Sequence, residues 1–74
     1  MFISVKDLCY LMDERIKYVE EAIEAEKIQA TDDYEEYMEK MKSKLLHNVQ
    51  KLESISSNQK LINKYRTKVQ NLFQ

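Results

Sequence analysis

The chain has 74 residues, of which 34% are charged, and it contains no glycine and no proline. A chain of this length forms a single domain with a small core, and without glycine it disfavours tight hairpins. Residues 1–74 are rich in the strong helix formers Lys, Glu, Gln, Leu and Met, so we expect one all-α domain.

The net charge of −1 hides an asymmetry between the two halves of the chain. Residues 1–39 hold twelve acidic and four basic residues, a net of −8, whereas residues 40–74 hold one acidic and eight basic residues, a net of +7. Such a separation of charge is typical of proteins that act by binding. The start of the chain lacks a basic region, and no stretch approaches about 18 apolar residues, so we expect neither a signal peptide nor a membrane segment.

The first helix is expected over residues 4–30. Ser4 and Asp7 stand three apart, as in a capping box. Arg15 and Glu26 fall within the apolar arc of this helix, where each needs a polar partner if it is buried. The apolar residues that follow helical spacing are Val5, Leu8, Leu11, Met12, Ile16, Val19, Ala22 and Ile23.

The second helix is expected over residues 32–54, after a turn at residues 30–33 in which Thr31 or Asp32 serves as the cap. Its apolar positions follow a heptad, which predicts coiled-coil-like packing in a homodimer. Asn48 interrupts this seam, and a buried Asn there fixes register or oligomeric state. The heptad consists of Tyr34, Met38, Met41, Leu45, Asn48, Leu52 and Ile55, and the expected dimer or core seam is Met38, Met41, Leu45, Asn48 and Leu52.

A third helix is expected over residues 58–73, capped by Ser57 or Asn58. The alternative is an unbroken helix that passes through the poor helix formers of residues 54–59. The predicted architecture is therefore a helical hairpin plus a third C-terminal helix. The apolar face of the last segment holds Leu61, Ile62, Tyr65, Val69, Leu72 and Phe73.

Residue types that perform catalysis or bind metals are scarce. His47 is the only histidine and Cys9 the only cysteine, and neither has a partner at the spacing of a metal site or a nucleophile–base pair. The Glu-x-x-His motif of di-iron bundles is absent. A single thiol fits a reducing, cytoplasmic setting. We therefore expect a protein that is not an enzyme and that uses no metal or cofactor.

The acidic half of the chain admits three interpretations: a soluble charged surface, pairing with the chain's own basic helices, or mimicry of a polyanion. Duplex DNA carries about one charge per 1.7 Å, and a rod with carboxylates along one side presents a similar potential to a basic groove. Tyrosines among the carboxylates add contacts that charge alone does not supply. The candidate partner-binding surface consists of Asp13, Glu20, Glu21, Glu24, Asp32, Asp33, Tyr34, Glu35, Glu36, Tyr37 and Glu39.

The basic half favours a different function, the binding of nucleic acid. Seven of its eight basic residues are lysines, and the acidic half would repel phosphates. We therefore expect no direct nucleic-acid binding, and a small helical nucleic-acid-binding regulator is the alternative function.

The Leu72-Phe73 pair resembles the end of the Gln-x-x-Leu-Phe peptides that bind bacterial sliding clamps, although Gln70 stands one residue too close. Core packing of Leu72 and Phe73 is the other interpretation.

In size, helical character and acidic helices, the whole chain resembles the small phage-encoded proteins that shut down host replication, among them the staphylococcal-phage inhibitors of the bacterial sliding clamp. This resemblance implies a homodimer that acts in the host cytoplasm. The dimer would occupy the basic, DNA-encircling channel of the clamp and prevent its loading onto DNA. The residues assigned to that contact come from the charge pattern, with Tyr34 and Tyr37 as anchors.

Overall fold

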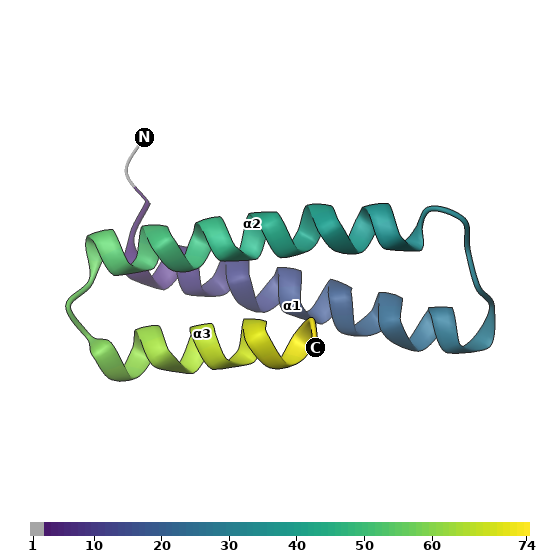
Figure 1. Ribbon diagram of the computed structural model, residues 1–74. Helices are drawn as coiled ribbons and strands as arrows, with labels where there is room; N and C mark the ends of the chain where they lie inside the picture. Colours follow the sequence, from purple (N-terminus) through teal and green to yellow (C-terminus); the bar gives the residue numbers. More distant parts are fainter. Residues whose placement is uncertain (1–2) are drawn as a thin grey trace.

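The computed structural model describes residues 3–74, which form three α-helices and no strand. Helix α1 spans Val5–Ile28, α2 spans Tyr34–Ile55 and α3 spans Gln59–Leu72. Consecutive helices run in opposite directions, so that α1 and α3 point the same way (Figure 1). The prediction of an all-α hairpin followed by a third helix is confirmed.

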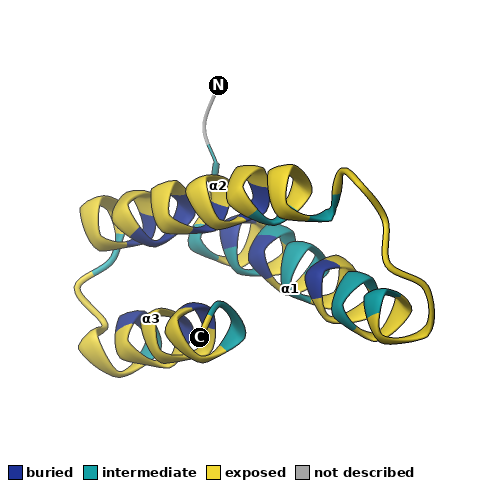
Figure 2. Cartoon of the chain, turned by 45° about the vertical axis from the view of Figure 1, so that its right-hand side comes forward, coloured by how far each residue is buried: buried dark blue, intermediate teal, exposed yellow. Residues whose placement is uncertain are grey.

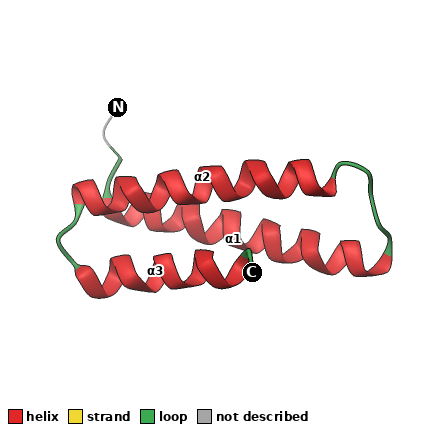
Figure 3. Cartoon of the chain, viewed as in Figure 1, coloured by secondary structure: helices red, strands yellow, loops and turns green. Residues whose placement is uncertain are grey.

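The helices α1 and α3 begin at side-chain caps. The Ser4 hydroxyl accepts a hydrogen bond from the Asp7 backbone N–H at 3.1 Å, and the Asn58 side chain accepts one from Leu61 N–H at the same distance. Each such cap stabilises a helix by about 1 kcal/mol. At Ser56 the backbone becomes extended, so α3 is a separate helix and not a continuation of α2 (Figure 3).

The predicted cap of the second helix is wrong. Helix α2 begins at Tyr34 after Asp33, whose side chain makes no capping hydrogen bond, so Asp32 and Asp33 precede the helix. The Thr31 hydroxyl and backbone N–H both donate to the Glu26 carboxylate of α1, at 3.2 and 3.1 Å. Thr31 therefore closes the end of the preceding helix, and the first turn of α2 contains only Glu35 and Glu36 as acidic residues.

The core lies where all three helices face one another. Helix α2 packs against both α1 and α3, which contact each other less. Figure 2 shows the buried residues along the inner faces of the helices, while the loop between α1 and α2 is exposed. The core consists of Leu8, Met12, Val19, Met41, Leu45, Val49, Leu52, Ile62, Tyr65 and Val69.

The predicted seam of α2 is filled within one chain. Met41, Leu45, Asn48 and Leu52 are buried, and Met38 is half-buried against the same core. Ile55, the last residue of the heptad, is exposed. The heptad thus corresponds to the contact of α2 with α1 and α3. The same apolar spacing is needed in a three-helix bundle and in a coiled-coil dimer, so the spacing alone does not distinguish the two.

The two charged residues predicted inside the apolar arc of α1 both have partners. Half-buried Arg15 donates a hydrogen bond of 2.5 Å to the buried Asn48 side chain of α2, and Glu26 accepts from Thr31. Asn48 therefore fixes the register of α1 against α2 inside the chain. Within residues 3–74 no buried side-chain polar atom lacks a partner.

We predict that Arg15 and Asn48 are energetically coupled. Asn48→Leu removes the acceptor and leaves the half-buried guanidinium without it, which should lower the free energy of unfolding by about 1–3 kcal/mol. The double variant Arg15→Met/Asn48→Leu should lose less than the sum of the two single variants, as measured by urea unfolding followed by circular dichroism. Strictly additive losses would show that the contact contributes nothing specific.

Candidate functional site

Antiparallel pairing of α1 and α2 concentrates negative charge at one end of the molecule. The second half of α1 and the first half of α2 lie together beside their connecting loop, and they extend past the end of α3 (Figure 1). Residues 20–40, which form this end, contain nine acidic and two basic residues, a net of −7. The rest of the chain contains four acidic and ten basic residues, a net of +6. We call residues 20–40 the acidic end.

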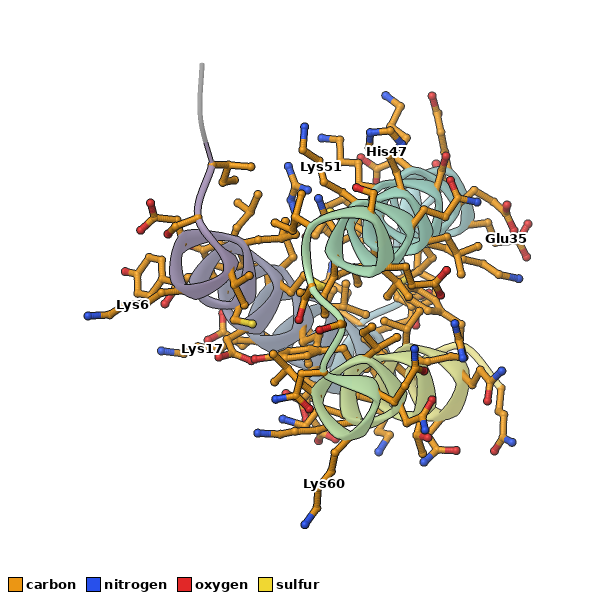
Figure 4. The ribbon with its side chains drawn as sticks, turned by 90° about the vertical axis from the view of Figure 1, so that its left-hand side faces the viewer. Lys6, Lys17, Glu35, His47, Lys51 and Lys60 are labelled. Atoms are coloured by element: carbon orange, nitrogen blue, oxygen red, sulfur yellow. The ribbon has the colours of Figure 1, made fainter. Side chains whose placement is uncertain are left out.

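The opposite end of the molecule is basic. Figure 4 looks along the helices from that side, where Lys6, Lys51 and Lys60 project outward from three different helices. His47 is exposed on α2 beside a shallow groove that Arg15 and Lys51 also line. The asymmetry between the sequence halves thus becomes an asymmetry between the two ends of a molecule about 41 Å long.

The acidic end contains all but one residue of the predicted partner-binding surface. Every carboxylate of this set is exposed, Tyr37 is exposed and Tyr34 is half-buried. Two surface ion pairs lie here, Lys27–Glu24 at 3.0 Å and Lys40–Glu36 at 3.7 Å, and exposed pairs of this kind contribute little stability. The predicted residues at this end are Glu20, Glu21, Glu24, Asp32, Asp33, Tyr34, Glu35, Glu36, Tyr37 and Glu39.

Asp13 is the predicted surface residue that lies elsewhere. Its carboxylate accepts a hydrogen bond of 2.9 Å from the Tyr65 hydroxyl of α3. Burial of Tyr65 raises the pKa of its phenol well above the usual value of 10, and the hydrogen bond to Asp13 and the negative charge of Asp13 raise that pKa further. Asp13 therefore joins α1 to α3. The Nζ atoms of Lys64 and Lys68 lie 5.7 and 5.6 Å from the centroid of the Tyr65 ring.

An apolar notch interrupts the acidic end where α3 stops. Its apolar lining comes from all three helices and the residue after α3, and its volume is about 620 Å³. Glu35, Glu39 and Lys42 of α2 and the terminal Gln74 complete the lining. The apolar side chains that define the notch are Ile23, Tyr34, Met38, Leu72 and Phe73.

The sequence did not reveal this notch, because its residues carry the same helical spacing as the core. Ile23, Met38, Leu72 and Phe73 do pack against the core, but all four are only half-buried. The signal that was available is helix length: α3 has 14 residues, against 24 in α1 and 22 in α2, so it leaves the hairpin partly uncovered. Leu72 and Phe73, the possible clamp-binding pair, thus contribute to the wall of the notch.

Neither a metal cluster nor a membrane-spanning helix is found within residues 3–74. No group of three or more His, Cys, Asp or Glu side chains there lies close enough to hold a metal ion. None of the helices combines the length and the apolar character needed to cross a membrane. Comparison with protein-family models, curated proteins and solved structures gives no match for the chain. The site is therefore interpreted from its geometry and charge.

We predict that Tyr65 makes stability fall at alkaline pH. Because its pKa is raised in the folded state, the stabilisation from Tyr65 is complete below the unfolded pKa of about 10 and is lost as the pH rises above that value. Tyr65→Phe should cost about 0.5–1.5 kcal/mol at neutral pH and should flatten the decline above pH ~10, measured by urea unfolding across that range. Equal slopes for both proteins would contradict the assignment.

We also predict that the acidic end lowers the stability of the fold through like-charge repulsion. Glu21→Gln and Glu39→Gln should each raise the free energy of unfolding by about 0.2–0.5 kcal/mol at low ionic strength, and the gain should vanish in high salt. The matched control is Glu53→Gln, since Glu53 pairs with Arg66 of α3. This control should lose up to about 1 kcal/mol, the opposite sign for the same chemical change.

Proposed function

We propose that this chain is a non-enzymatic binding protein whose acidic end occupies the DNA-binding surface of another protein and so excludes DNA from it. The observation that carries this proposal is the net charge of −7 over residues 20–40, gathered at one end of a helical hairpin. All of the carboxylates there except Glu26 are exposed, and the net charge already includes the two lysines that pair with Glu24 and Glu36.

The arrangement of these carboxylates suits a surface that binds a nucleic-acid duplex. The exposed carboxylates on α1 are those of Glu20, Glu21 and Glu24. Those on the adjacent α2 are Glu35, Glu36 and Glu39. Packed helices lie about 8–10 Å apart, so the two helices present neighbouring rows of anions. A cationic groove that attracts phosphates attracts such rows by the same long-range field, which accelerates association.

The partner that we propose is the bacterial sliding clamp, and the corresponding role is a phage-type inhibitor of host DNA replication. The clamp encircles DNA with a basic channel, and the resemblance of the whole chain to phage inhibitors of that clamp suggests this target. Filling the channel with the acidic end would block the passage of DNA without any chemical step.

A homodimer, as expected from the sequence, would present two acidic ends to such a channel. Pairing would use a surface other than the predicted seam, because Met41, Leu45, Asn48 and Leu52 are buried within the single chain. The exposed aromatic residues Tyr10 and Tyr18 of α1 lie outside the core and remain free for such a contact.

We predict that the purified clamp of a Gram-positive bacterium binds this protein with a steep dependence on salt. Reversal of Asp32, Asp33, Glu35 and Glu36 to Lys should lower the association rate about 10–1,000-fold at low ionic strength, because these charges steer the encounter. The difference should shrink as salt is added. Surface plasmon resonance with immobilised clamp measures both rates.

The matched control reverses four lysines of the basic part, Lys51, Lys60, Lys64 and Lys68, to Glu. This variant should associate at least as fast as the wild type, because the acidic end is intact. Unchanged association after reversal of the acidic residues would contradict the proposal.

A gel shift with nonspecific duplex DNA at low salt tests the alternative function. Strong, salt-sensitive binding would instead support a nucleic-acid-binding regulator that uses the basic end.

A further inference from the structure

The proposed electrostatic contact does not explain why the acidic end also contains a notch with apolar side chains. These side chains are Ile23, Tyr34, Met38, Leu72 and Phe73. Helix α3 ends at Leu72, while α1 and α2 continue beyond it. Ile23 and Met38 are therefore covered on one side only, and both are half-buried. An incompletely filled apolar pocket with a polar rim is the geometry in which protein interfaces bind an anchor side chain.

The surroundings of the notch restrict what can fill it. Two carboxylates, Glu35 and Glu39, and one ammonium group, Lys42, belong to its lining. The surrounding acidic end has a net charge of −7, which disfavours an acidic occupant. A small inorganic cation is also a poor fit, because Glu35 and Glu39 are the only carboxylates in the lining, and within residues 3–74 no group of three or more His, Cys, Asp or Glu side chains could hold a metal ion.

We propose that the notch takes one large apolar side chain, such as Leu, Met or Phe, from a basic segment of the protein partner. The apolar side chain would lie against Ile23, Met38 and Phe73, while flanking Lys or Arg residues of the same segment pair with Glu35 and Glu39. This inference rests on the proposed function and adds the chemistry of the contact. It makes the surface specific for a basic protein and not for cations in general.

The notch and the carboxylates have different kinetic roles. Charges outside the buried centre of an interface act mainly on association, whereas a buried apolar anchor acts mainly on dissociation. Anchors that fill a pocket account for most of the affinity at many interfaces. The carboxylates of the acidic end therefore accelerate association with the partner, and the contact in the notch slows dissociation.

The test compares apolar-to-Gln substitutions that leave every charge in place. Met38→Gln and Phe73→Gln alter the notch from α2 and from the end of α3, and Leu46→Gln is the control on an exposed part of α2 away from the notch. With immobilised sliding clamp as the probe, both notch variants should dissociate about 5–30-fold faster, with association rates within about twofold of the wild type. Leu46→Gln should change neither rate.

Circular dichroism and thermal unfolding accompany each variant, and Phe73→Gln keeps the test valid if Met38→Gln loses its fold, because Phe73 follows the last helix. Wild-type dissociation from a folded notch variant, together with slow association of the charge-reversal variant, would overturn this inference and leave the proposed function standing. Faster dissociation of the Leu46→Gln control to the same extent would overturn it as well. No binding of the wild type to the clamp at low salt would overturn both.

Discussion

Burial of α2 on two sides is the constraint on which the rest of this structure depends. A chain of 74 residues has one small core, and here ten buried apolar side chains supply it. Leu45 and Leu52 are fully buried, and burial of such a side chain contributes about 1.5–3 kcal/mol. Because α2 must cover its apolar face with both α1 and α3, the chain folds back twice, and each neighbouring pair of helices becomes antiparallel.

Two polar contacts fix how these helices are aligned. Apolar packing alone distinguishes less sharply between alternative alignments of two helices, because the hydrophobic effect is non-directional. The contacts of Arg15 with Asn48 and of Tyr65 with Asp13 join α1 to α2 and α1 to α3 at single positions. Each group would lose its partner if its helix slid by one turn, so these contacts favour one register over the others.

The acidic end combines high charge with sparse packing. We expect repulsion among its carboxylates to destabilise the folded chain, and the early end of α3 leaves apolar side chains half-buried there. Both features oppose stability, which is common at sites that serve binding, since a surface prepared for a partner keeps interactions unmade until the partner arrives. The groove near His47, at the basic end, is bordered by cations instead, those of Arg15, Lys44 and Lys51.

The amino-acid sequence by itself determined the helical segments, their inner faces and the cap at Ser4, because these depend on local spacing and on neighbouring backbone groups. It left the cap of the third helix open between Ser57 and Asn58, and it did not exclude an unbroken helix through residues 54–59. It failed at Thr31, since the hydroxyl partner there is Glu26 of the preceding helix. It also could not tell whether the heptad with Asn48 meets other helices of the same chain or of a second chain. Only the tertiary structure shows that the heptad packs against α1 and α3 of the same chain. It also places the carboxylates at one end of the molecule, pairs Asp13 with Tyr65 and forms the notch. These features depend on which helices lie side by side and where α3 ends along them, which spacing within one helix does not encode.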